Sequence, residues 1–85
     1  MIEGKVAIIT GASRGVGKAT AMALSKHGAC VVLAARTQND LEKVADEIQV
    51  SGGKALVIKT DVTLLDQVQQ LVNQTLDHYG KIDIL

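Results

Sequence analysis

Short apolar runs rich in β-branched residues alternate along the chain with longer segments of helical character. The runs are nearly continuous in apolar residues, as in strands that are covered on both faces. We predict strands over Lys5–Thr10, Cys30–Arg36, Ala55–Thr60 and Lys81–Leu85. We predict helical segments over Val16–Gly28, residues 37–53 and residues 61–80. This alternation is typical of an α/β fold with a parallel sheet and right-handed crossovers.

The helical segments carry their own periodic signals. Leu41, Val44, Ala45 and Ile48 recur at the spacing of one helix face. The apolar stripe of the third segment is Val68, Leu71, Val72, Leu76 and Tyr79. We expect Thr63 and Asp66 to form a capping pair at its start. If the strand order is 3-2-1-4, the first two helices cover one face of the sheet and the third crosses to the other face.

Composition narrows the possible partners. The chain has 85 residues, enough for one small domain, and its formal net charge is zero. Balanced charge and a lack of Phe and Trp argue against nucleic acid. No apolar run approaches the roughly 20 residues of a membrane helix, and the first residues do not resemble a signal peptide. Cys30 is the only cysteine, which excludes an internal disulfide and fits a cytoplasmic protein.

A glycine-rich turn joins the first predicted strand to the first predicted helix. Gly11, Gly15 and Gly17 lie within the sequence TGASRGVGKAT. We expect Gly11 to turn the chain sharply, Gly15 to let a ligand approach the backbone, and Gly17 to let the helix lie close to the sheet. The free N–H groups at the start of the helix would then face a diphosphate. A glycine-rich turn without a ligand is the simpler alternative.

Lys18 follows Gly17 as the lysine of a phosphate-binding P-loop follows its last glycine. That motif also needs glycine at position 12 and a hydroxyl at position 19. Ala12 and Ala19 occupy these positions. We therefore interpret Lys18 as an exposed lysine in the first turn and exclude a nucleotide triphosphatase.

The sequence TGASRGVG resembles the T-G-x-x-x-G-x-G cofactor loop of the classical short-chain dehydrogenases/reductases. LAAR, TDVT and YGKIDIL also stand where that family has such segments. The resemblance implies a Rossmann-type doubly wound parallel sheet, here over β-α-β-α-β-α-β. It also implies an oxidoreductase that transfers hydride between a nicotinamide and a small carbonyl or alcohol substrate.

The end of the second strand distinguishes NAD from NADP. An acidic residue there would bind the ribose hydroxyls of NAD, but the position holds Arg36, preceded by Ala35. A guanidinium can form a forked contact with a 2′-phosphate. In the resembled family, a basic pair such as Arg14 and Arg36 marks members that prefer NADP(H). The alternative for each arginine is a solvated surface side chain.

The same resemblance implies that Asp61 accepts a hydrogen bond from the adenine amino group and that Val62 packs near the ring. Asp61 could also cap the turn before the next helix, and the two roles are compatible. Thr37 would add its backbone N–H and hydroxyl, and Ser13 would bind a phosphate or the loop itself. The implied cofactor-binding residues are Gly11, Ser13, Arg14, Gly15, Val16, Gly17, Arg36, Thr37, Asp61 and Val62.

Residues 1–85 contain no candidate catalytic residue and no cluster of metal ligands. The family's Tyr-x-x-x-Lys pair is missing, since Tyr79 and Lys81 are two residues apart and Tyr79 falls on an apolar stripe. We therefore interpret the chain as the N-terminal NADP-binding portion of a Rossmann domain without its catalytic half, inactive alone. On that interpretation one face of the sheet keeps too little cover, and we expect self-association through it.

Two other classes of function stay open. A non-catalytic nucleotide-binding or interaction module needs no Tyr-x-x-x-Lys pair. Another doubly wound fold, such as a methyltransferase, would need an acidic residue where Arg36 stands.

Overall fold

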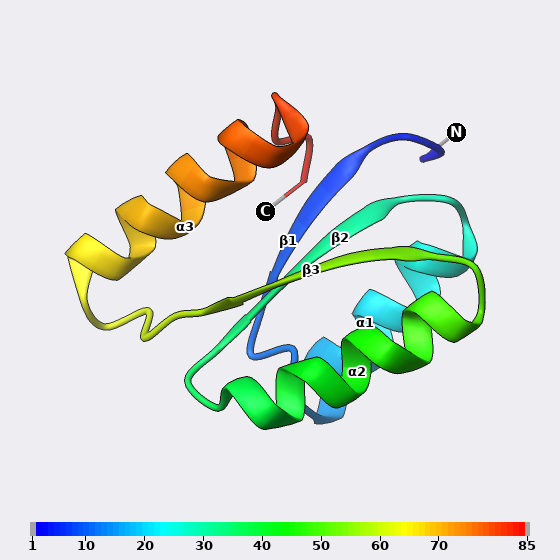
Figure 1. The fold of residues 1–85 in the computed structure, drawn as a ribbon, viewed down its shortest axis with the longest axis horizontal. Coiled ribbons are helices and arrows are strands. Elements are labelled where there is room, and N and C mark those ends of the chain that lie inside the picture. The colour runs from blue at the N-terminus through cyan, green and yellow to red at the C-terminus, as the bar shows by residue number, and fades with distance from the viewer. Residues whose placement is uncertain (1, 85) are drawn as a thin grey trace.

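Strands and helices alternate strictly in the computed structural model, which describes residues 2–84 (Figure 1). The elements are β1 (Val6–Thr10), α1 (Gly15–Lys26), β2 (Cys30–Ala35), α2 (Gln38–Val50), β3 (Lys54–Lys59) and α3 (Leu65–Tyr79). The predicted α/β alternation is therefore confirmed. The largest shift in a boundary is at α3, because the residues before it form a separate turn.

The three strands form one parallel sheet in the order β1-β2-β3. Val6 is in register with Cys30, and Cys30 with Lys54. On the other side of β1, Ala7 forms a parallel bridge with Ile84. The backbone N–H of Ile8 donates to the Ile84 carbonyl at 2.9 Å. The predicted strand over Lys81–Leu85 is thus present only as this single bridge, at the place that the order 3-2-1-4 gives a fourth strand. Leu85 lies outside the described residues.

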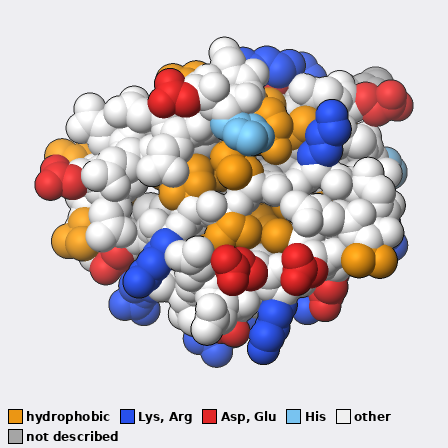
Figure 2. All heavy atoms as spheres, in the orientation of Figure 1, with side chains coloured by type: hydrophobic (Ala, Val, Ile, Leu, Met, Phe, Trp, Pro, Cys, Tyr) orange, Lys and Arg blue, Asp and Glu red, His pale blue; other side chains and the backbone are white. Residues whose placement is uncertain are grey.

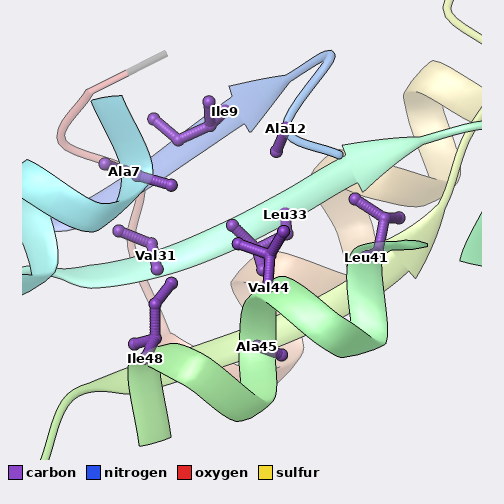
Figure 3. Close-up of a cluster of buried hydrophobic side chains, with 10 residues drawn as sticks. Ala7, Ile9, Ala12, Val31, Leu33, Leu41, Val44, Ala45 and Ile48 are labelled. Carbon is purple, nitrogen blue, oxygen red and sulfur yellow. The ribbon is translucent and has the colours of Figure 1, made fainter. Parts of the chain in front are cut away.

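Side chains of each strand alternate between two cores, as the pleat of a sheet requires. Ala7 and Ile9 of β1 point to the same face as Val31 and Leu33 of β2. Helices α1 and α2 cover this face. Figure 3 shows Val44 and Ile48 of α2 turned toward β2. The helix face predicted from the periodicity of α2 is therefore its buried face.

The opposite face is covered by α3, which lies across the sheet from α1 and α2 (Figure 1). Ile8, Val32 and Leu71 are buried there. Tyr79 packs against this cluster and is partly buried. The crossing of the third helix is thus confirmed, and the second core holds six buried residues against ten in the first.

The expected capping pair of Thr63 and Asp66 is wrong. The residue that caps α3 is Leu64, and no side chain bonds the free N–H groups there. Thr63 instead donates its hydroxyl to Asp61. At the other end, Gly80 takes a φ of 78° and its N–H bonds the Leu76 carbonyl at 2.7 Å, which ends the helix as predicted.

The described helices are short. The longest, α3, has 15 residues, and none within residues 2–84 is both long and apolar enough to cross a bilayer.

We expect Leu41→Ala to lower the free energy of unfolding by about 2–5 kcal/mol, because Leu41 is fully buried on the side of α2 that faces the sheet. Val50→Ala is the matched control in the same helix, since Val50 is 88% exposed; it should change stability by less than about 0.5 kcal/mol. Urea unfolding followed by circular dichroism measures both. Equal losses would contradict the placement of α2.

Candidate functional site

An open cavity of about 360 Å³ lies where the carboxyl ends of the three strands meet. It is lined by three segments, one after each strand. The lining residues are Gly11, Ser13, Arg14, Ala35, Arg36, Thr37, Thr60, Asp61, Val62 and Thr63. In open α/β sheets, ligands bind outside these strand ends, so this cavity is the candidate site.

The loop after β1 is held in a tight turn. Gly11 has a φ of 61°, a conformation that favours glycine. The N–H of Ala12 donates to the Ala34 carbonyl at 3.3 Å. A Cβ on Gly17 would stand 2.7 Å from the carbonyl carbon of Gly11 and closer still to its oxygen. Gly17 therefore lets α1 begin against the loop itself, rather than against the sheet as we expected.

The first turn of α1 leaves backbone N–H groups unpaired. The N–H of Lys18 is the first to bond, to the Arg14 carbonyl at 3.3 Å. Within residues 2–84, the N–H groups of residues 15–17 have no acceptor, and no side chain caps the helix. The Lys18 side chain lies 3.4 Å from the Glu47 carboxylate. It thus ties α1 to α2 at the surface and is not a P-loop lysine.

Two arginines give the cavity a positive character. Arg14 comes from the glycine loop and Arg36 from the residue after β2, and both are exposed. Neither forms an ion pair within the part of the chain that the structure describes. Both guanidinium groups are therefore available to an anion.

The turn after β3 is built around Asp61. Its Oδ1 accepts the Thr63 N–H at 2.9 Å and the Thr63 hydroxyl at 2.6 Å. These two hydrogen bonds, with a smaller contribution from the positive charge of Arg36, lower the pKa of the Asp61 carboxyl below 3.8. The N–H of Asp61 donates to Gln67 Oε1 at 2.7 Å. Asp61 therefore does cap this turn, and it is ionised at neutral pH.

Not every predicted binding residue lies in the same hollow. Seven of the ten line the cavity, and Gly15, Val16 and Gly17 do not. Val16 and Gly17 line a neighbouring cleft of about 350 Å³, with Thr10 and Ile84 among its other walls. The site thus extends to both sides of the start of α1.

Three lining residues were not predicted. Ala35 and Thr60 also line the cavity, and the Thr60 N–H donates to the Ala35 carbonyl at 2.8 Å. Thr63 was assigned to a helix cap. The signal that could have found it is the spacing of Asp61 and Thr63, which suits an aspartate that hydrogen-bonds two residues ahead.

The described residues hold neither a metal cluster nor an activated tyrosine. No group of three or more His, Cys, Asp or Glu within residues 2–84 could hold a metal ion. Burial raises the pKa of the Tyr79 phenol above 10.0, whereas a tyrosine that exchanges protons near neutrality needs a lowered pKa. Tyr79 is the packing residue that its periodicity indicated.

Comparisons with known proteins agree with this geometry. An uncharacterized oxidoreductase of Listeria monocytogenes is 48% identical over 84 residues, which cover 99% of this chain and 34% of that protein. A short-chain type dehydrogenase/reductase from Mycobacterium marinum has a TM-score of 0.93 at 50% identity, over 96% of this chain and 33% of that one. A metagenomic short-chain oxidoreductase, solved in complex with NADP, has a TM-score of 0.95 at 39% identity. The match covers 99% of this chain and 38% of that one.

The chain therefore spans about a third of the length of these relatives. The sequence model of the short chain dehydrogenase family matches residues 5–85. With its Rossmann-type fold, the chain belongs to the short-chain dehydrogenase family, whose members use nicotinamide dinucleotides.

Proposed function

We propose that this chain binds NADP(H), as the cofactor-binding portion of an oxidoreductase that transfers hydride between the nicotinamide and a small carbonyl or alcohol substrate. The observation that carries the proposal is a pair of guanidinium groups, Arg14 and Arg36, that line one cavity and form no ion pair among residues 2–84. A dianionic 2′-phosphate matches such a pair in charge and in hydrogen-bond geometry.

The residues present fit the remainder of the cofactor. The unpaired N–H groups of residues 15–17 suit a diphosphate at the start of a helix. Gly11 and Gly17 keep side chains away from that approach. Ser13 and Thr37 offer hydroxyl groups, and Asp61 and Val62 offer an acceptor and an apolar contact to an adenine. Val16 lines the neighbouring cleft, which offers room for the remainder of the cofactor.

The cofactor and the residues of this chain would contribute different parts of the reaction. When bound, the nicotinamide supplies or accepts the hydride. The residues described here bind the adenosine and phosphate end, fix its orientation and select the phosphorylated form. The oxidoreductase of Listeria monocytogenes and the NADP-bound metagenomic enzyme support this proposal by their likeness. The free thiol of Cys30 suits the cytoplasm, where we place the protein.

A second, non-catalytic function is favoured by one observation: the only tyrosine is a packing residue on α3. A nucleotide-binding module would use the same cavity without turnover. Both functions predict that residues 1–85 bind the dinucleotide without turnover. Carbonyl reduction with NADPH therefore separates them only when it is measured on a protein that joins these residues to a catalytic portion.

We also propose that two copies associate through the face of the sheet that α3 covers, including its border along β3. Among the described strands, β3 pairs with β2 alone, and a free strand edge is a template for another chain. Leu56 is partly buried, and Leu76 of α3 is 42% exposed. Figure 2 shows hydrophobic side chains reaching the surface in the middle of this view.

We expect Arg36→Asp to reverse the cofactor preference. The parent protein should bind NADPH about tenfold or more tightly than NADH, because charge-assisted hydrogen bonds hold the 2′-phosphate. The introduced carboxylate would repel that phosphate and accept hydrogen bonds from the ribose of NADH. Calorimetric titration with both dinucleotides measures the change.

Lys43→Asp is the matched control for this reversal, since it makes the same change in charge on exposed α2, away from the cavity. It should leave the preference unchanged. A preference for NADPH that survives Arg36→Asp would rule out Arg36 as the selecting group.

We expect Gly17→Ala to weaken NADPH binding by at least about tenfold, because the new Cβ would collide with the Gly11 carbonyl and displace the loop. Gly4→Ala is the control: Gly4 has a φ of 74° and open space around it, remote from the cavity. Gly4→Ala should lower the free energy of unfolding and leave the affinity for NADPH unchanged. Unchanged affinity in Gly17→Ala, measured by NADPH fluorescence, would contradict the role of the loop.

We expect Leu56→Lys to reduce self-association, because a charge on an edge strand opposes pairing with another chain. Val50→Lys, on the exposed side of α2, is the control and should leave the mass distribution unchanged. Sedimentation velocity across a concentration series measures this. A parent protein that stays monomeric throughout would refute the proposed interface.

A further inference from the structure

Hydrogen bonds with two residues that the sequence analysis did not assign to the site, Thr63 and Gln67, hold the turn that carries Asp61. Thr63 donates both its N–H and its hydroxyl to Asp61 Oδ1, at 2.9 and 2.6 Å. Gln67, in the first turns of α3, accepts the Asp61 N–H at 2.7 Å. One contact fixes the carboxylate and the other fixes the backbone that bears it.

This arrangement leaves the two carboxylate oxygens unequal. Oδ1 already accepts two hydrogen bonds, whereas Oδ2 accepts none within residues 2–84. Arg36 is near enough for its charge to act on Asp61, yet the two form no ion pair. The fastened turn therefore keeps Oδ2 as a free acceptor, and Asp61 lines the cavity.

We infer that Thr63 and Gln67 are positioning residues that hold Asp61 Oδ2 ready to accept a hydrogen bond from the exocyclic amino group of adenine. The inference rests on the proposed binding of NADP(H) in this cavity. It adds that recognition of the adenine base depends on side chains that need not touch the cofactor.

Thr63 and Gln67 hold Asp61 in different ways, so their contributions can be tested separately. Loss of the Thr63 hydroxyl removes the shorter of the two bonds to Oδ1 and lets the carboxylate rotate. Loss of the Gln67 acceptor frees the Asp61 N–H and loosens the backbone of the turn. Both changes act on the direction of the Asp61 carboxylate while its charge remains, so they should affect discrimination between bases more than overall affinity.

The test compares NADP⁺ with its hypoxanthine analogue, in which a carbonyl oxygen replaces the amino group of adenine. We expect the parent protein to prefer NADP⁺ by about tenfold, because the analogue offers an acceptor where Asp61 needs a donor. Thr63→Val and Gln67→Met should reduce this ratio to about threefold or less. Dissociation constants from calorimetric titration give the ratio for each variant.

Two variants control for loss of structure. Thr63→Ser keeps the hydroxyl donor and should retain the parent ratio. Gln70→Met places the same substitution at an exposed position of α3 that forms no side-chain hydrogen bond within the described residues, and it should also retain the ratio. Equal weakening of both dinucleotides by Thr63→Val and Gln67→Met would overturn the inference.

A second readout is independent of the cofactor. In the parent protein, the Asp61 carboxyl should titrate below pH 3.8, followed by carbon NMR. Thr63→Val should move its midpoint upward, and Thr63→Ser should not. An unmoved midpoint in Thr63→Val would overturn the role of Thr63. If the parent protein binds neither dinucleotide, the proposed function fails as well; if it binds NADP⁺ and the variants keep its ratio, only this inference fails.

Discussion

Parallel pairing of three buried strands is the constraint on which the rest of the structure depends. Because the strands run in the same direction, the segments that follow them meet at one edge of the sheet. The glycine loop, Arg36 and the Asp61 turn are far apart in the sequence and become neighbours only through this pairing. The Thr60 N–H and the Ala35 carbonyl join two of these segments directly, at 2.8 Å.

The candidate site combines two kinds of recognition that differ in physical origin. Backbone N–H groups at the start of α1 are free to donate hydrogen bonds, because the first turn of a helix offers them no acceptor. In the proposed function, charged side chains provide selection: Arg14 and Arg36 form no ion pair within residues 2–84, whereas Asp61 accepts two hydrogen bonds from Thr63. Because the positive charges of the arginines and the negative charge of Asp61 stay separate in this cavity, one nucleotide could contact the arginines through its phosphate and Asp61 through its base.

The sequence predicted the fold and seven of the residues that line the cavity, because their signals are local. Buried strands are recognised in the sequence as apolar runs. The apolar residues that recur along α2, such as Leu41 and Ile48, are buried in the structure. The turn after β3 was harder to predict. Thr63 suited both a helix cap and an Asp61 turn, and in the structure it donates to Asp61. The same turn also depends on an acceptor from the next helix, Gln67, which the sequence spacing did not indicate. The contact of Gly17 with the loop was also missed, since it depends on how closely α1 approaches residue 11 in space.

The central claim is that bare backbone at the start of α1 binds a diphosphate while arginines at the end of β2 and in the loop select its phosphorylated adenosine. The most direct measurement is a titration of ¹⁵N-labelled protein with NADPH and with NADH, followed through the amide signals of residues 15–17. Our account expects these amides to shift with both dinucleotides and to saturate at a lower concentration of NADPH. Amides that stay unmoved, or that saturate first with NADH, would contradict it.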